Sequence, residues 1–332
     1  MDRMTLGRGG PEVSALGLGC MSMSGTYGPT DDAESIATVC AALEAGITLI
    51  DTGDFYGMGH NELLLREALA GGRRDKAILS VKFGALRDPR GGWSGLDGRP
   101  AAVRNFLAYT LRRLGTDHID IYRPARLDPN VPIEETVGAI AEMITAGYVR
   151  HIGLSEAGVE TIRRAHAVHP IADVQLEYSL MSRGIETEIL PVLRELGIAV
   201  TAYGVLSRGL LSGSIQPGAS DIRTQRLPRF QGENLTRNLA LVEALAAVAR
   251  RKGATPAQLA TAWVAGQGQD ILPLIGARTR ERLAESLAVA DPKLTAQELA
   301  EIERAVPAEA VAGTRYEAAQ MAHLDSEKPG PR

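Results

Sequence analysis

Short apolar runs alternate with longer amphipathic stretches along most of the chain. The runs are rich in β-branched residues and predict buried strands, whereas apolar residues spaced three or four positions apart predict helices. Eight strands are expected, at Leu16–Leu18, Thr48–Asp51, Ala77–Val81, Ile119–Tyr122, Val149–Leu154, Asp173–Leu176, Ala199–Tyr203 and Ile271–Ile275. The helices expected between them include Asp32–Ala45, Asn61–Ala70, Val103–Leu114, Ile133–Ala146, Val159–Val168 and Ile189–Leu196.

This alternation predicts an α/β fold with parallel strands, because a parallel connection needs a helix-length return. Eight is also the number of strands that closes a (β/α)8 TIM barrel. The alternative, a doubly wound open sheet, would carry a glycine-rich phosphate-binding turn after its first strand. The segment Gly17–Ser22 reads GLGCMS and lacks the third glycine of that turn, which favours the barrel.

Three segments lie outside the repeating pattern. We expect a single barrel domain over residues 1–332, with an N-terminal hairpin at 1–16 that closes the bottom of the barrel. The stretch 204–237 is rich in Gly, Ser, Pro and Arg, follows a predicted strand and is expected to form a long cofactor or lid loop. The polar tail 307–332 is expected to fray at Asp325–Arg332.

Composition narrows the class of protein. With 45% hydrophobic and 23% charged residues the chain is typical of globular proteins, and its net charge of −4 argues against a nucleic-acid partner. The sequence has no signal-like N-terminus and no apolar run long enough for a membrane span. Only Cys20 and Cys40 are present, which excludes a disulfide framework and a cysteine metal site and predicts a cytoplasmic protein.

Candidate chemistry lies at the carboxyl ends of the predicted strands, where barrel enzymes place their active sites. Asp51 and Tyr56 follow the second strand, and Lys82 follows the third. Because consecutive barrel strands are neighbours, we expect these three side chains to meet. A lysine beside a phenol is expected to lower the pKa of the phenol, and a carboxylate would orient the lysine. Such a tyrosine can donate a proton to a carbonyl oxygen.

Several motifs resemble those of the aldo-keto reductase superfamily, in order and over nearly the whole chain. They are DTGDFYG (51–57), SVKFG (80–84), RLGTD (113–117), IGLSE (152–156), VQLEY (174–178), LLSG (210–213) and PLIG (273–276). Among the branches of this superfamily, a bacterial branch has the most similar sequence motifs, namely GLGCM (17–21), YGP (27–29) and RLDPNVPIEETVG (126–138). The resemblance implies a metal-independent NADPH-dependent reductase of aldehydes or ketones, with Tyr56 as proton donor, Lys82 as its partner and Asp51 supporting the lysine.

One position departs from the family pattern. The family usually has a histidine after the fourth strand, where this chain has Ala125. Arg123 shares the parity of Ala125 along the strand, so it either points into the substrate cavity or pairs with a carboxylate inside the barrel. The predicted substrate contacts are Arg123, Ala125, Trp93, Phe55 and Tyr27; the three aromatic residues are expected to line an apolar mouth, with ordinary packing as the alternative.

The resemblance also implies a cofactor site, with Ser155 and Gln175 on the nicotinamide carboxamide and Tyr203 stacked on its ring. The arginines that follow the eighth strand suit the 2′-phosphate of NADPH, although arginines on a solvated helix are the alternative. Glu156 and Ser286 stand where the family commonly has asparagine. The residues implied to contact NADPH or NADP are Met21, Ser155, Gln175, Tyr203, Gly204, Val205, Leu206, Ser207, Arg208, Gly209, Gly276, Ala277, Arg278, Arg282, Glu285 and Ser286.

Two functions follow from these observations. The first is a reductase that acts on a small-molecule carbonyl substrate, without nucleic-acid or membrane partners and with its oligomeric state left open. The second is an NADP(H)-binding protein of the same fold with weak or vestigial catalysis, acting as a redox-responsive binding subunit. Ala125 is the residue that raises this second hypothesis, because losing one hydrogen-bond donor in a catalytic site costs about 10²–10³ in rate.

Overall fold

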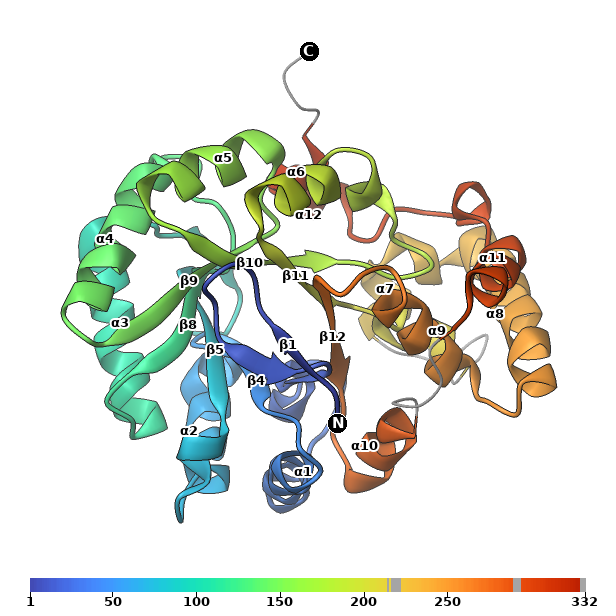
Figure 1. The fold of residues 1–332 in the computed structure, drawn as a ribbon, viewed down its shortest axis with the longest axis horizontal. Coiled ribbons are helices and arrows are strands. Elements are labelled where there is room, and N and C mark those ends of the chain that lie inside the picture. Colours follow the sequence, from blue (N-terminus) through green and yellow to red (C-terminus); the bar gives the residue numbers. More distant parts are fainter. Residues whose placement is uncertain (214, 216–221, 289–293, 329–332) are drawn as a thin grey trace.

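The predicted strands pair side by side and close into a barrel (Figure 1). The computed structural model describes residues 1–213, 215, 222–288 and 294–328. The barrel strands follow one another in sequence order around the ring, and all neighbours are parallel. They are β3 (Gly17–Gly19), β4 (Leu49–Gly53), β5 (Ile78–Phe83), β8 (Ile119–Pro124), β9 (Val149–Ser155), β10 (Ile171–Glu177), β11 (Ala199–Tyr203) and β12 (Ile271–Gly276).

Helices surround the barrel and confirm the (β/α)8 prediction (Figure 1). Amphipathic segments form them because one face packs on the strands and the other meets solvent. Their bounds are α1 (Asp32–Glu44), α2 (His60–Ala68), α3 (Pro100–Leu114), α4 (Ile133–Thr145), α5 (Val159–Val168), α6 (Ile189–Leu196), α7 (Ile222–Arg226), α8 (Gly232–Arg251), α9 (Pro256–Ala265), α10 (Arg280–Leu287), α11 (Ala296–Ala305) and α12 (Ala318–Met321).

An N-terminal hairpin of β1 (Arg3–Thr5) and β2 (Glu12–Ser14) packs on one end of the barrel. Its turn needs glycine, because Gly7 has φ of 75° and a Cβ there would lie 2.1 Å from the carbonyl oxygen of Ala172. Apolar side chains from the hairpin and from the strand starts fill this end of the barrel, namely Leu6, Val13, Leu49, Ile121, Ala199, Leu272 and Leu274.

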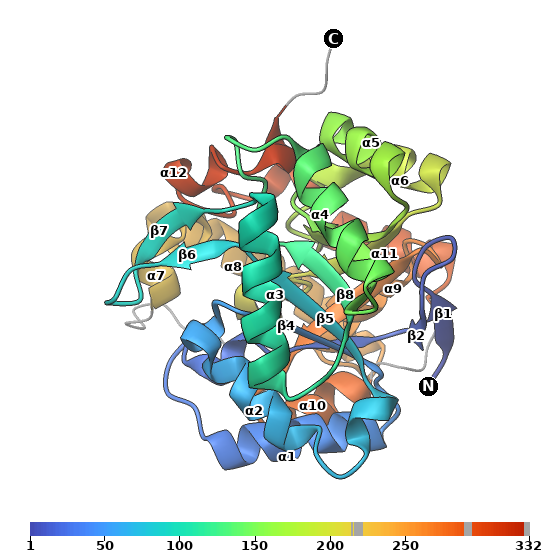
Figure 2. The same cartoon turned by 90° about the vertical axis from the view of Figure 1, so that its left-hand side faces the viewer.

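A second hairpin, β6 (Ala85–Arg87) and β7 (Trp93–Leu96), follows β5 at the carboxyl end of the barrel. Neither of these strands is among those predicted from the sequence. Figure 2 shows the two hairpins at opposite ends of the barrel. The carboxyl ends of the barrel strands, where the candidate chemistry lies, therefore face β6 and β7.

Two predicted segments differ from expectation. The stretch 204–237 is not one long loop, because it contains the 3-10 segment Ser207–Ser212, α7 and the start of α8. Residues 214 and 216–221 of this stretch lie outside the described residues.

The C-terminal tail is not frayed through residue 328. Arg315 and Asp325 are buried, because they bond to groups at the barrel mouth. Residues 329–332 lie outside the described part. Among the described helices, none combines the length and the apolar character needed to cross a membrane.

Candidate active site

Asp51, Lys82 and Tyr56 come together at the carboxyl end of the barrel, as the strand order predicts. Asp51 lies on β4 and Lys82 on the adjacent β5, and the lysine ammonium forms an ion pair with the Asp51 carboxylate. Tyr56 begins the short 3-10 turn after β4, and the centre of its ring lies 5.2 Å from Lys82 Nζ. All three side chains are at least nine-tenths buried.

The Asp51 carboxylate is held by two further neutral donors. Ser80 Oγ donates to it at 2.9 Å, and the amide of Gln175 on β10 donates to it at 2.8 Å. These bonds cross the inside of the barrel and fix the carboxylate, which in turn fixes the lysine. Gln175 is thus tied to the catalytic candidates through its amide nitrogen.

The pKa of Tyr56 departs from expectation. Burial, followed by the negative charge of Asp51, raises the pKa of Tyr56 well above its ordinary value, although Arg126 acts in the opposite direction. Burial therefore outweighs the lowering that a neighbouring lysine is expected to give, and Lys82 is itself paired with Asp51. Burial likewise lowers the pKa of Lys82. The phenol is accordingly kept protonated, which is the form that a proton donor requires.

Arg123 lies deep inside the barrel rather than at its mouth. Its guanidinium is fully buried and pairs with Asp173 at 2.9 Å, and it also donates to Ser80 Oγ at 2.9 Å. The structure therefore favours the second interpretation of Arg123, pairing with a barrel carboxylate, over a substrate contact. The side chain at the next position of the same parity, Ala125, is also buried.

Arg126, which the sequence analysis did not select, lies at the mouth instead. It follows β8, and its Nη1 donates to the carbonyl oxygen of Ala125 at 2.6 Å and to Ser155 Oγ at 3.3 Å. Its Nη2 lies 3.5 Å from the hydroxyl of Tyr316. The sequence could have indicated Arg126, because this residue directly follows Ala125, the position where the family usually has its histidine.

Glu156, predicted only as a departure from the family asparagine, follows β9 in a left-handed conformation with φ of 52°. Its carboxylate accepts from both terminal nitrogens of Arg315, from the Tyr203 hydroxyl at 2.7 Å, and from Ser326. Burial alone would raise the pKa of Glu156, but Arg315 outweighs it and brings the pKa to about 2. Glu156 therefore anchors the C-terminal residues to the barrel mouth.

Tyr203, predicted to stack on a nicotinamide, ends β11 beside this group. Its hydroxyl lies 3.0 Å from that of Tyr316, in addition to its bond to Glu156. The phenol ring is thereby held in one orientation by its hydroxyl end. No local pattern in the sequence could indicate this, because Tyr316 is 113 residues away along the chain.

The predicted aromatic mouth is only partly assembled. Phe55 packs edge-on against Tyr56 with ring centres 4.8 Å apart, and Arg87 lies over its other side. Trp93 pairs with Arg87 across the β6–β7 hairpin and is half exposed. Tyr27 lies beside Arg223 of α7, whose guanidinium carbon is 5.6 Å from the centre of its ring, and it also acts electrostatically on Tyr56.

The predicted phosphate loop after β11 has an unusual backbone. Ser207, Arg208 and Gly209 have successive φ values of 46°, 55° and 91°. Two of these residues are not glycine, and left-handed backbone at such residues is characteristic of functional sites. Ser207 Oγ is buried and has no hydrogen-bond partner among the described residues, so a ligand oxygen could satisfy it.

The remaining residues of this loop surround the same turn. Gly204 has φ of 65°, and a Cβ there would approach Glu177. Val205 is buried and Leu206 packs against the core. The Arg208 side chain turns back to the mouth, where it donates to Glu177 at 2.9 Å and to the carbonyl oxygen of Arg315 at 2.8 Å.

The arginines after β12 have different partners. Arg280 forms an ion pair with Glu34 of α1 at 2.9 Å, and Arg282 pairs with Glu285 at 2.9 Å. Arg278 donates only to the carbonyl oxygen of Pro29, at 3.3 Å. Of the three, Arg278 is therefore the one without a carboxylate partner in the described ranges.

Other predicted cofactor residues flank these two segments. Gly276 is exposed with open space at its Cα, and Ala277 is buried. The Ser286 hydroxyl bonds back to the carbonyl oxygen of Arg282 at 3.0 Å. Met21 begins the 3-10 turn after β3 and is partly exposed.

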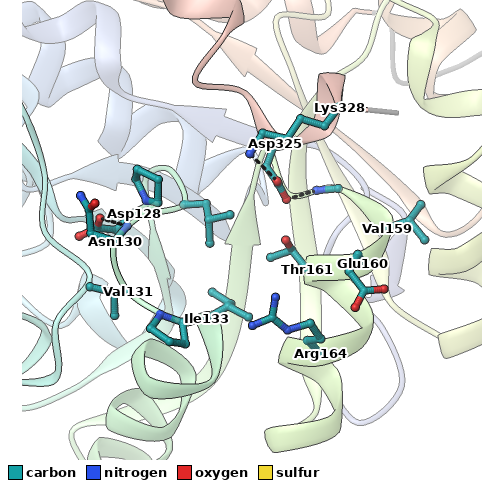
Figure 3. Close-up of a pocket in the computed structure, with 14 residues that line it drawn as sticks. Asp128, Asn130, Val131, Ile133, Val159, Glu160, Thr161, Arg164, Asp325 and Lys328 are labelled. Carbon is teal, nitrogen blue, oxygen red and sulfur yellow. Dashed lines mark hydrogen bonds and ion pairs between the residues drawn. The ribbon is translucent and has the colours of Figure 1, made fainter. Parts of the chain in front are cut away.

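A separate groove of about 560 Å³ lies between the loop after β8 and the first turn of α5 (Figure 3). Asp325 borders it and accepts a hydrogen bond from the backbone of Gly158 at 2.8 Å, while Lys328 pairs with Asp325 at 3.2 Å. No residue predicted to bind substrate or cofactor lines this groove. Within the described ranges, no three acidic, His or Cys side chains are grouped so that they could hold a metal ion.

Comparisons with known proteins agree with the fold and the motifs. The model of the aldo/keto reductase family matches residues 15–307. A Glycine max protein named "Probable aldo-keto reductase 1" is 42% identical over 318 residues, which cover 94% of this chain and 90% of that protein.

Solved structures show the same similarity. A glycerol dehydrogenase from Gluconobacter oxydans superposes with a TM-score of 0.83 at 29% identity, covering 99% of this chain and 98% of its own. An aldo-keto reductase from Bacillus halodurans in its holo form gives 0.80 at 27% identity, covering 99% and 100%. The chain therefore belongs to the aldo/keto reductase family of oxidoreductases.

Proposed function

We propose that this protein is an NADPH-dependent reductase of aldehydes or ketones. The observation that carries the proposal is the buried group formed by Asp51, Lys82 and Tyr56 at the carboxyl end of the barrel. The holo form of the Bacillus halodurans relative supports a bound cofactor in this fold. The alternative of a binding subunit is not favoured, because the described relatives are oxidoreductases and the acid, the amine and the phenol are all in place.

A bound NADPH would supply the hydride for the carbonyl carbon and would itself be oxidised. The carbonyl oxygen receives the proton of the Tyr56 hydroxyl, so that the product is an alcohol and water later restores the phenol proton. Burial keeps Tyr56 protonated until the oxygen gains negative charge. Lys82, oriented by Asp51, places its positive charge beside the ring and stabilises the phenolate that forms.

The described residues fit a dinucleotide. Ser155, at the end of β9, pairs with Gln175 on the neighbouring β10, where the two would hold the carboxamide, and the anchored ring of Tyr203 would stack on the nicotinamide. The Ser207 hydroxyl, which has no partner within the described ranges, and the left-handed turn at Ser207–Gly209 suit the pyrophosphate. Arg278, which has no carboxylate partner among the described residues, suits the 2′-phosphate that distinguishes NADPH from NADH.

The place of the usual histidine is proposed to be taken by Ala125, which offers no hydrogen bond to the substrate oxygen. Tyr56 then acts as the sole proton donor, and the small side chain enlarges the cavity beside it. The substrate is proposed to be a small carbonyl compound and the location the cytoplasm, in keeping with two cysteines that are not paired with each other.

The test follows NADPH absorbance with a panel of neutral aldehydes, ketones and quinones, and repeats each assay with NADH. Tyr56→Phe is expected to lower kcat by about 10²–10⁴-fold, because it removes the transferred proton. The dissociation constant for NADPH, measured by quenching of protein fluorescence, should stay the same. Binding of NADPH without turnover that depends on Tyr56 would contradict the proposal.

A further inference from the structure

Arg126 is distinguished from the other arginines at the barrel mouth because no carboxylate of the described residues bonds to it directly, although the negative charge of Glu156 acts on it without contact. In the described part of the chain it forms no ion pair with a carboxylate, and its Nε makes no hydrogen bond. Nη1 is occupied by Ala125 and Ser155, while Nη2 has only the 3.5 Å contact to the Tyr316 hydroxyl. The edge formed by Nε and Nη2 is therefore almost unused.

The neighbouring arginines at the barrel mouth are each paired with a carboxylate. Arg208 pairs with Glu177 at 2.9 Å, and Arg229 lies 3.5 Å from the other oxygen of the same carboxylate. Arg315 pairs with Glu156. A charge withdrawn from water is costly unless it is paired, so an unpaired guanidinium among paired ones indicates a partner that arrives with a ligand.

The position of Arg126 relative to the proposed chemistry defines that ligand. It contacts Ser155, at the end of β9. Its positive charge also acts on Tyr56, where it opposes the rise in pKa that burial causes. Arg126 directly follows Ala125, the position where the family usually has the histidine that bonds to the substrate oxygen, so a carbonyl bound at the Tyr56 hydroxyl is expected to lie near Arg126. The planar edge of a guanidinium matches the two oxygens of a carboxylate.

We propose that Arg126 binds a carboxylate of the substrate and that this protein prefers aldehydes carrying such a group. This inference rests on the proposed reductase function. The carboxylate itself is unchanged in the reaction: the aldehyde carbon gains the hydride, its oxygen gains the Tyr56 proton, and the cofactor is oxidised by two electrons. Arg126 is then a specificity residue that supplies binding energy away from the reacting carbon.

The test compares para-carboxybenzaldehyde with its methyl ester, which has nearly the same shape but no charge. The wild-type protein should favour the acid by at least about tenfold in kcat/KM. Arg126→Gln should lower kcat/KM for the acid by about 100-fold, mainly through KM, and change that for the ester by less than about threefold. Arg126→Lys should restore part of the difference, since it keeps the charge but loses the planar edge.

Arg99→Gln is the matched control, because Arg99, the residue before α3, is exposed and its carboxylate partner among the described residues is Asp97. It should leave both substrates unaffected. Equal losses on acid and ester in Arg126→Gln, or no preference for the acid in the wild type, would overturn the inference while leaving the reductase function intact.

A binding measurement keeps the inference testable if the reductase function fails. Calorimetric titration of the protein–NADP mixture with para-carboxybenzyl alcohol, the expected product, should give heat that is lost in Arg126→Gln and absent with benzyl alcohol. If neutral aldehydes show no turnover that depends on Tyr56 but this binding persists, only the proposed function is wrong. If the acid does not bind, the carboxylate site is wrong.

Discussion

Asp54 shows how a single buried acid can make stability depend on pH. It lies between the catalytic candidates Asp51 and Tyr56 in sequence and is nine-tenths buried. Burial first, and then the neighbouring Glu62, raise the pKa of Asp54 to about 7, while Arg113 opposes them. Arg113 forms an ion pair with Glu62, and its positive charge also acts on Asp54. Asp54 is therefore a buried group whose charge changes near neutral pH.

Because the pKa of Asp54 is higher in the folded protein, the folded state holds its proton longer as pH rises. The free energy of unfolding should thus fall between about pH 4 and pH 7. The variant Asp54→Asn should not show this dependence. The free energy of unfolding of the wild type, measured in urea relative to that of the variant, should therefore fall by roughly 2–3 kcal/mol between about pH 5 and pH 8. His151 and His166, whose pKa burial lowers, act oppositely in both proteins and cancel in the comparison. Parallel stability profiles for the two proteins would exclude the effect.

At the scale of elements, the C-terminal segment 311–328 is fastened to the barrel mouth by polar bonds. Arg315 bonds to Glu156, and the backbone of Ser326 donates to the carbonyl oxygen of Glu156 at 3.0 Å. Asn238 of α8 holds the backbone of Ala312 through both atoms of its amide. The segment therefore orients the Tyr203 ring, through Tyr316 and Glu156, from a distant part of the chain.

Removing the guanidinium of Arg315 should release this segment. Arg315→Met leaves Glu156 buried without its main partner, and we expect a loss of about 3–5 kcal/mol in the free energy of unfolding by urea. Limited proteolysis should then cut the segment 311–328 faster. Glu327→Gln is the control, because the Glu327 side chain is 40% exposed and its bond to Arg315 should contribute less than about 1 kcal/mol. A loss below 1 kcal/mol in Arg315→Met would show that the ion pair does not hold the segment.

At the scale of the whole molecule, the regular pattern of the barrel could be predicted and its mouth could not. Each predicted strand appears with its ends within two residues, because apolar runs and helix-length connections are local signals. Asp51 and Lys82 meet for the same reason. The alternation of side chains along β8 predicted that Arg123 points into the barrel, but Arg123 lies too deep to reach the barrel mouth. The same alternation gives no information on Arg126, because Arg126 lies beyond the end of β8.

Contacts between distant segments explain the other differences. The bond between Glu156 and Arg315 joins residues 159 apart, and no local pattern carries that information. The direction of the Tyr56 pKa also depends on burial, which several strands create together. Local motifs in the sequence therefore indicated the candidate reacting groups but not the neighbours that set their charge.

Cofactor binding should stabilise the whole barrel, since the proposed site spans β9, β10, β11 and β12. A ligand that binds only the folded protein adds about 2.7 kcal/mol to the free energy of unfolding at a concentration 100 times its dissociation constant. We expect NADP to give this increase in urea unfolding, and NAD at the same concentration to give much less. Tyr56→Phe should show the same increase as the wild type, because the Tyr56 hydroxyl is assigned to the substrate oxygen rather than to the dinucleotide. Equal stabilisation by NADP and NAD would contradict the proposed contact between Arg278 and the 2′-phosphate. If neither dinucleotide stabilises the protein, the proposed dinucleotide site is wrong.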